Sequence, residues 1–271
     1  MLRAVKQVRA AVSLLNPDEV RDLAQRRVTI GLVAKSPDDY EHMERALMPL
    51  SSGLYRASDE FAPRRPDLVF YHSDLECPNG AFSFDPGAPD ETVAQVLRAH
   101  DELGLPLARH FLSFRRQAVE RIVHAISREN ALFAVTTALP DVIPNLIELP
   151  WAIGEFASDT AFLTINQVRM AFMVAGACGA QVGYAHQKAE VLSIGCGALG
   201  WRAIARELVG KIPLGGGLIP KGAIAYAGTF VIGKGLERYY RARTTYSPAE
   251  REEIYQQALE RGRTIVRSLA K

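Results

Sequence analysis

A loop with the potential to bind phosphate follows the first strand that the sequence predicts. Residues 28–33 read VTIGLV, an apolar run typical of a buried strand, and residues 37–47 have the pattern of a helix. Nucleotide-binding proteins place the motif G-x-x-x-x-G-K-[ST] between such a strand and helix. Its glycine amides and lysine bind the phosphates, and its hydroxyl reaches Mg²⁺. This chain could therefore bind or hydrolyse a nucleotide in this way only if the loop between residues 33 and 41 carries that motif.

The loop differs from the phosphate-binding motif at each defining position. Ala34 and Asp39 replace the two glycines, while Tyr40 replaces the lysine and Glu41 the hydroxyl residue. The acidic residues also repel phosphate from a helix N-terminus that would otherwise attract it. We predict a degenerate loop without nucleotide hydrolysis, in a strand–helix unit that holds no ligand.

An aspartate that could act through Mg²⁺ follows the second predicted strand, residues 67–71. Asp74 has the right position, but Cys77 stands where a glycine is expected three residues later. No Asn-Lys-x-Asp motif for base recognition occurs, so we interpret Asp74 as a surface residue. The six histidines are scattered without the spacing of metal ligands. The sequence thus predicts no catalytic residue, no cofactor and no metal site.

A second group of polar residues interrupts an apolar helical pattern. Asn166, Gln167 and Arg169 lie within one turn, and Asn166 and Arg169 share a face because they are three residues apart. Buried polar groups need partners, and the favoured interpretation is an internal ion pair with a purely structural role. A small polar site or a clamp between helices is the functional alternative. Three carboxylates are candidate partners: Asp141, Glu148 and Asp159.

Small residues recur every four positions along the same predicted helix, which spans 159–186. They are Ala171, Ala175, Gly179 and Gly183. Such spacing lets two helix backbones approach closely, in a membrane or in a soluble bundle. We therefore predict that these four residues form a helix-packing face.

The first half of the chain alternates strands and helices, which predicts a small parallel sheet with right-handed crossovers. An amphipathic helix over 2–15 and a short helix over 17–26 precede it. Gly104 is expected to end the helix over 90–103, and Ser113 to cap the helix that follows it. The sheet is expected from strands 28–33, 67–71 and 105–112, with helices 37–47, 90–103 and one that begins at Ser113.

Charge and glycine content change near residue 130. Residues 131–235 contain 13 charged residues out of 105, and 15 of the 21 glycines of the chain. The predicted helices there are 159–186, 191–208, 221–240 and 248–270, the last with a capping box at Ser247. We expect three parts: N-terminal helices over 1–27, a small α/β domain with a degenerate P-loop-like segment over 28–130, and an all-α bundle over 131–271.

Composition excludes several classes of protein. The 271 residues hold 32 Lys and Arg against 30 Asp and Glu, and a net charge of +2 gives no electrostatic basis for binding nucleic acid. Three cysteines cannot form a disulfide framework. Charged residues interrupt the first apolar positions, so no signal peptide is predicted. These features favour a cytoplasmic protein.

Membrane insertion is left open by the sequence. Residues 170–187 form an uncharged stretch of 18 residues, which just reaches the length of a membrane span. The stretch contains Gln181, His186 and Gln187, which are unfavourable in lipid. A soluble or peripheral bundle and an inserted bundle, with 170–187 and 212–234 in the membrane, are both compatible with this pattern.

Five segments of the C-terminal half form a pattern: 164–170 (TINQVRM), 179–184, 201–208, 212–216 and 223–229. On these segments the C-terminal half resembles the YcjF-like family of unknown function, a helical domain that follows a small GTPase domain in many bacterial proteins. The resemblance implies association with the inner membrane and with GTPase-type partners. It also implies that the N-terminal part, 28–130, is a degenerate GTPase-like domain, and it carries no known activity.

Three functions are compatible with these observations. The first is a non-enzymatic scaffold or interaction protein, self-associating or associated with the inner membrane surface through residues 160–235. The second is a divergent nucleotide-binding switch. The third is a carrier of lipid or a small apolar ligand in the bundle. We expect a protein partner or a second copy of the chain, and no nucleic acid.

Overall fold

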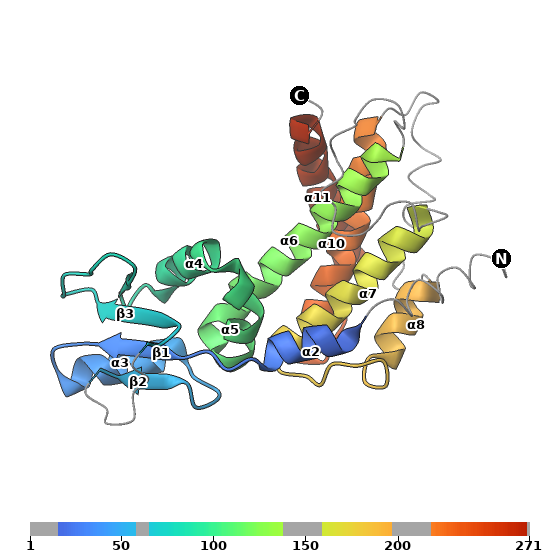
Figure 1. The fold of residues 1–271 in the computed structure, drawn as a ribbon. Helices are drawn as coiled ribbons and strands as arrows, with labels where there is room; N and C mark the ends of the chain where they lie inside the picture. Colours follow the sequence, from blue (N-terminus) through green and yellow to red (C-terminus); the bar gives the residue numbers. More distant parts are fainter. Residues whose placement is uncertain (1–15, 58–64, 138–158, 197–217, 270–271) are drawn as a thin grey trace. The chain divides into compact units, whose positions relative to one another are not determined.

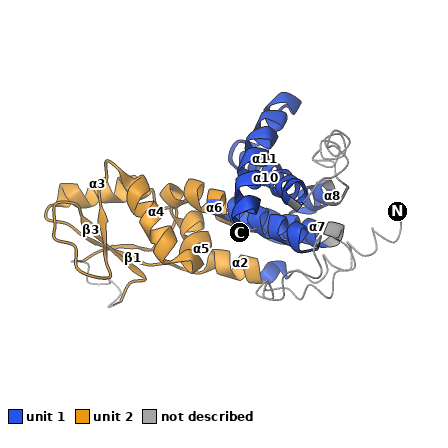
Figure 2. Ribbon diagram, turned by 90° about the horizontal axis from the view of Figure 1, so that it is seen from above, with its two compact units in different colours: residues 1–18, 121–175, 182–271 blue, residues 19–120, 176–181 orange. Residues whose placement is uncertain are grey.

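A computed structural model describes residues 16–57, 65–137, 159–196 and 218–269. They form two compact units (Figure 2). The α/β unit comprises residues 19–120 and 176–181, and the helical unit comprises the described residues of 1–18, 121–175 and 182–271. Helix α6, Leu112–Thr136, contributes to both units. Residue 130, near which the composition changes, lies inside this helix.

Four parallel strands form the sheet of the α/β unit, in the order β2-β1-β3-β4 (Figure 1). The strands are β1 Ile30–Val33, β2 Leu54–Arg56, β3 Leu68–His72 and β4 Phe82–Phe84. Ile30 is opposite Leu54 on one side and Leu68 on the other. The predicted small parallel sheet is confirmed, with β1 and β3 as expected. The edge strands β2 and β4 were not predicted.

One face of the sheet carries the core of the α/β unit. Side chains alternate between the faces of a strand, and Ile30, Leu32 and Phe70 are fully buried on the same face. The rings of Phe70 and Phe84 stack with centroids 5.4 Å apart. Burial of these large side chains stabilises the sheet by about 1.5–3 kcal/mol for each residue.

The helices of the α/β unit confirm the predicted helices at 17–26, 37–47 and 90–103, the last as an α-helix followed by a 3-10 turn, and they correct the predicted strand at 105–112. The predicted helix at 37–47 is α3, Pro37–Leu47. The predicted strand at 105–112 is wrong, because residues 104–110 form α5. Gly104 has a helical φ of −57° and begins α5 instead of ending a helix. The other elements are α2 Pro17–Gln25, α4 Pro89–Ala99 and the 3-10 helix η1 Asp101–Leu103.

Ser113 does not cap α6 as predicted. The helix begins at Leu112, and the Ser113 hydroxyl donates to the Leu47 carbonyl at 3.0 Å. An antiparallel bridge pairs Pro49 with Phe111 just before the helix. The Leu112 amide donates to the Met48 carbonyl at 3.0 Å, so the backbone after α3 satisfies the first amide of α6.

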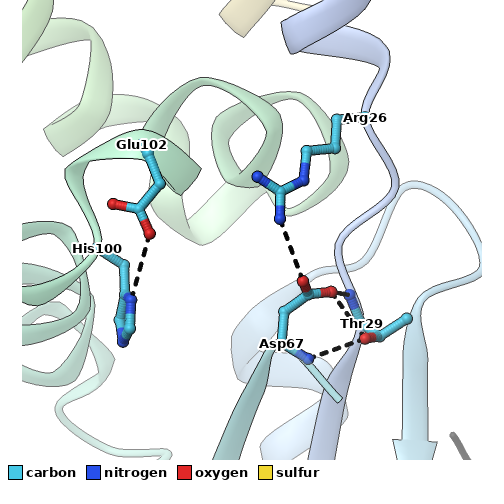
Figure 3. Close-up of polar contacts among 5 residues, drawn as sticks. All are labelled: Arg26, Thr29, Asp67, His100 and Glu102. Carbon is cyan, nitrogen blue, oxygen red and sulfur yellow. Dashed lines mark hydrogen bonds and ion pairs between the residues drawn. The ribbon is translucent and has the colours of Figure 1, made fainter. Parts of the chain in front are cut away.

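A carboxylate joins the amino ends of β1 and β3 (Figure 3). Asp67 accepts hydrogen bonds from the Thr29 amide and hydroxyl, both at 2.8 Å, and from the Arg26 guanidinium at 3.4 Å. Partial burial favours the neutral acid, but these bonds outweigh it and lower the pKa of Asp67. The contact between His100 and Glu102 in the same view, 3.4 Å long, lies just after α4.

The helical unit consists of the second part of α6 and four further helices in the described residues. They are α7 Asp159–Ala177, α8 Lys188–Cys196, α10 Leu218–Ala242 and α11 Pro248–Leu269. Tyr226 and Tyr255 are fully buried among alanines and valines where α6, α10 and α11 meet. Helix α10 covers the predicted 221–240, and α11 matches the predicted 248–270 as far as Leu269, so the helical bundle is confirmed.

The boundaries of α7 and α8 differ from the predicted ones, whereas the start of α11 is as predicted. The predicted helix 159–186 is too long, because α7 ends at Ala177. The predicted helix at 191–208 corresponds to α8, which begins at Lys188, and its later residues lie outside the described ones. The capping box is confirmed, since the Glu250 amide donates to Ser247 Oγ at 3.3 Å and the Ser247 amide to Glu250 Oε2 at 2.7 Å. The predicted helix at 2–15 lies outside the described residues.

No helix in the described part of the chain is both long and apolar enough to cross a membrane. Residues 170–187 contain the end of α7 and the turn that follows, so they are not one continuous helix. Of the second stretch, 212–234, only residues 218–234 are described, and they belong to α10.

Candidate functional site

Asn166 and Gln167 belong to a buried polar cluster in the core of the helical unit. The Asn166 amide donates to Asn130 Oδ1 of α6 at 2.9 Å, and the Asn130 amide donates to Thr229 Oγ1 of α10 at 2.8 Å. Gln167 Nε2 approaches the same hydroxyl at 3.4 Å. All four side chains are at most 2% exposed. The cluster therefore ties α6, α7 and α10 together.

The chemistry of this polar cluster is that of a clamp. Its amides and hydroxyl do not titrate near neutral pH, and Thr229 has no base beside it in the cluster to make it a nucleophile. Gln167 Oε1 and Ser127 Oγ are buried and accept no hydrogen bond from the described residues. These two oxygen atoms could each accept a further hydrogen bond, but neither is a base or an activated nucleophile.

Arg169 pairs with a carboxylate that the sequence did not single out. Its guanidinium forms an ion pair with Glu129, which precedes Asn130 on α6. The predicted partners Asp141 and Glu148 lie outside the described residues, and the side chain of Asp159 is not described. Asn166 and Arg169, three residues apart on α7, thus face adjacent residues of α6. The predicted helix clamp contains these contacts, with Glu129 in place of the expected acids.

Half of the predicted helix-packing face lies in a turn. Ala171 and Ala175 are fully buried on α7, but Gly179 and Gly183 follow the end of the helix at Ala177. Gly179 has a φ of +81°, a conformation that glycine adopts without strain. These two glycines turn the chain and do not extend the helical face.

The close approaches in the helical unit occur at other glycines. A Cβ at Gly233 of α10 would lie 2.6 Å from Val123, and one at Gly222 would lie 2.7 Å from Val135 and Val266. A Cβ at Gly262 of α11 would lie 3.0 Å from the backbone of Ala223. Small residues therefore do permit close helix packing, as expected, but mainly along α10 and α11.

The carboxyl edge of the sheet contains the residues considered for phosphate binding. The strand order places β2 and β3 on opposite sides of β1, and ligands of open α/β sheets bind where the chain diverges in this way. Here Lys35 Nζ, after β1, donates to the Asp74 carbonyl, after β3, at 3.0 Å. The Asp74 side chain is 73% exposed. A lysine of the chain itself thus bridges the two loops.

The N-terminus of α3 is capped by its own side chains. The Asp39 amide donates to Ser36 Oγ at 3.2 Å, and the Ser36 amide donates to Asp39 Oδ2 at 3.1 Å. These hydrogen bonds with Ser36, together with nearby His72 and His42, lower the pKa of Asp39. The carboxylate therefore stays ionised at neutral pH, at the place where a bound phosphate would lie.

An open cleft lies beside this edge of the α/β unit. It has a volume of about 560 Å³ and is lined by His42, Arg45, His72 and Asp85, among other residues. Asp85 Oδ1 accepts a hydrogen bond from the Gly87 amide at 2.8 Å. Arg45 lies 3.9 Å from Glu41 and is largely exposed. Among the described residues, no group of three His, Cys, Asp or Glu side chains is arranged to hold a metal ion.

A histidine missed by the sequence analysis links three helices of the helical unit. His124 Nδ1 of α6 lies 2.5 Å from the Tyr226 hydroxyl of α10, and Arg261 of α11 reaches His124 Nε2 at 2.8 Å. Because arginine can only donate, Nε2 accepts and Nδ1 carries the proton in a neutral ring. Both ring nitrogens are then occupied, which leaves no free base.

Comparisons with known proteins give no relative. No protein family, no curated protein and no solved structure was found to match this sequence. The resemblance to the YcjF-like family therefore stays a prediction from the residues quoted above.

Proposed function

We propose that this protein is a non-enzymatic interaction protein whose α/β unit is a degenerate relative of a GTPase domain that no longer binds nucleotide. The single observation that carries the proposal is the state of the phosphate position. The amides of Ser36 and Asp39 at the N-terminus of α3 already donate hydrogen bonds to each other's side chains. Lys35 already donates a hydrogen bond to the Asp74 carbonyl. A phosphate would have to displace both sets of contacts and overcome the Asp39 charge.

Further observations support an interaction role. The polar cluster around Asn130 has the chemistry of a structural clamp and not of an active centre. The α/β unit exposes large apolar side chains at Met48, Leu50 and Leu112, of which Leu50 is 56% exposed. Exposed apolar side chains that gather in one place are typical of surfaces that contact other molecules. We therefore retain the resemblance to the YcjF-like family, with self-association or peripheral contact with the inner membrane as the proposed mode of action.

A nucleotide titration tests the first half of this proposal. Fluorescent GTP and ATP analogues with Mg²⁺ should show no saturable binding to the purified chain up to about 1 mM, a range in which even weak complexes of about −4 kcal/mol are detected. Asp39→Asn removes the charge that repels phosphate, so comparison of this variant with the unaltered chain measures how much that charge weakens nucleotide binding. Saturable binding at micromolar concentration to the unaltered chain would instead favour the divergent nucleotide switch.

Association is tested on the same chain. Sedimentation velocity and stepwise fractionation with salt, carbonate and then detergent report self-association and membrane contact. Leu50→Lys should reduce either of them. Leu192→Lys in α8 tests the segment 160–235 in the same way, because Leu192 is 64% exposed and belongs to the helical unit. Loss of association in one variant and not in the other identifies the unit that makes the contact. A chain that is monomeric at all concentrations and does not sediment with membranes would exclude both modes.

A further inference from the structure

A pocket of about 340 Å³ opens within the helical unit between α8, α10 and the start of α11. It is at the lower end of the range for small-molecule sites, about 300–1,000 Å³. Val231, Ile232, Leu236 and Tyr239 of α10 form one wall. Their spacing places them on one side of the helix, so α10 presents an apolar surface to the pocket.

A glycine forms part of this wall. Gly235 lines the pocket, and a Cβ built there would meet no atom within 4 Å. Gly233, two residues earlier, is different because its Cβ would lie 2.6 Å from Val123. The space in front of Gly235 is therefore open, and a side chain there would extend into the pocket without displacing its neighbours.

An arginine contributes the positive charge of the pocket. Arg251 of α11 lines it, and its Nε–H is buried and donates no hydrogen bond to any described residue. Its neighbours are satisfied: Arg238 pairs with Glu250, and Lys234 pairs with Glu237. No ion pair is recorded for Arg251 among the described residues. Arg251 as a whole is half-buried, but its buried Nε–H has no acceptor, which is unfavourable, so this position favours a negatively charged ligand.

The acidic residue of the pocket does not neutralise this arginine. Glu190 of α8 accepts a hydrogen bond from the Tyr240 hydroxyl at 2.7 Å. Burial and the Glu190 carboxylate raise the pKa of Tyr240 above its ordinary value, so the hydroxyl keeps its proton. A second negative charge on a ligand would be repelled by Glu190, which restricts the site to a single anionic group.

We propose that this pocket binds a small apolar carboxylic acid, whose carboxylate pairs with Arg251 and whose hydrocarbon body lies against Val231, Leu236 and Tyr239. Arginine is the side chain best suited to a carboxylate, because its planar fork donates two parallel hydrogen bonds. The inference does not depend on the proposed interaction function, since the site lies in the helical unit and involves no residue of the sheet.

Calorimetry with decanoate and decan-1-ol tests the charge requirement. Decanoate should bind the full chain at one site, about 10-fold to 100-fold more tightly than the alcohol, as expected for a hydrogen-bonded charge. Arg251→Gln should remove this preference. Arg267→Gln, an exposed arginine of the same helix, is the matched control and should leave both affinities unchanged. Equal affinities for decanoate and decan-1-ol would overturn the proposal.

Filling the pocket tests its location. Gly235→Leu should weaken decanoate binding about 10-fold or more, because the new side chain occupies the ligand volume. Gly235→Ala adds one methyl group and should retain binding, and thermal unfolding checks that both variants are folded. A folded Gly235→Leu variant with unchanged affinity, or the absence of saturable binding by the unaltered chain, would place any ligand elsewhere or exclude it.

Two classes of carboxylic acid have the required charge and apolar body, fatty acids and aromatic acids. Affinity that rises steadily from hexanoate to decanoate identifies an aliphatic ligand. Tighter binding of 3-phenylpropanoate than of decanoate identifies an aromatic one, held by Tyr239 and Tyr246. Either pattern supports the site provided that Arg251→Gln abolishes it.

Discussion

The two units place their polar groups in opposite ways. Of the buried polar or charged side chains among the described residues, the α/β unit has Thr92 alone, and all the others lie in the helical unit. In the α/β unit, contacts such as those of Asp67 and Lys35 lie at the exposed edges of the sheet. In the helical unit, the contacts of Asn130 lie in the core.

This difference determines what each polar contact contributes. A buried hydrogen bond is made in a low dielectric, and removing one partner leaves the other without a substitute. An exposed contact is replaced by water and is weakened by salt. The helical unit, with the less charged sequence, thus depends more strongly on individual polar residues. The same core disfavours charge, since burial raises the pKa of the Tyr255 hydroxyl to about 12.

The largest effect is expected for Asn130→Ala. The substitution leaves Asn166 and Thr229 buried without their partner, and we expect a loss of about 2–4 kcal/mol from the free energy of unfolding. Urea denaturation measures the loss, and hydrogen exchange should locate it in α7 and α10. The double variant Asn130→Ala/Asn166→Ala should be less destabilised than the sum of the two single variants. An additive result would mean that the cluster is not a network.

A steric variant should have the next largest effect. Gly233→Ala places a methyl group 2.6 Å from Val123 and is expected to destabilise the helical unit by about 1–3 kcal/mol. Gly235→Ala, on the same helix, is the control and should stabilise the protein by up to about 1 kcal/mol, because alanine is the better helix former. Thermal unfolding of the two variants should therefore shift in opposite directions.

Thr92→Val tests the exception in the α/β unit. The Thr92 hydroxyl donates to the Ser83 carbonyl at 2.7 Å, and the substitution keeps the shape of the side chain while removing this bond. We expect a loss of about 1 kcal/mol in urea denaturation. A loss as large as that of Asn130→Ala would contradict the contrast between the units.

The smallest effect is expected at the exposed edge. The pKa of Asp67 is lowered in the folded protein, so its ionised form stabilises the fold above the unfolded pKa of about 4 and this contribution is lost as the pH falls below it. Asp67→Asn should therefore lower stability at pH 7, and the difference from the unaltered chain should disappear toward pH 2–3. Denaturation across this range, repeated in about 1 M NaCl, should also show that salt reduces the difference.

Local signals account for the elements that were predicted correctly. Pro37 with the acidic residues after it and the Ser247 capping box marked the starts of α3 and α11. The run at 105–112 was misleading because short apolar runs fit a buried strand and a buried helix equally. Residues 104–108 of α5 are all buried, so no polar face revealed the helical period.

The contacts of the polar cluster could not be read from local sequence. Asn166 was recognised because it interrupts an apolar helix. Its partner Asn130 lies 36 residues away, and Asn130 is 99 residues from Thr229. Glu129 is an ordinary charged residue of an amphipathic helix, with nothing to mark it as the partner of Arg169. Pairing across such separations is set by how the helices pack.

Segment 176–181 has a consequence for the order of synthesis. It belongs to the α/β unit, where Arg109 donates to the carbonyls of Gly176 and Ala180, and Arg115 to that of Ala177. The remainder of that unit ends at residue 120, so a ribosome must add 60 more residues to reach Ala180. At about 5–20 residues per second this takes about 3–12 s. During that interval the Gly176 and Ala180 acceptors of Arg109 are not yet in place, whereas the Ala108 carbonyl, which accepts from Arg115 Nε at 3.3 Å, has already been made.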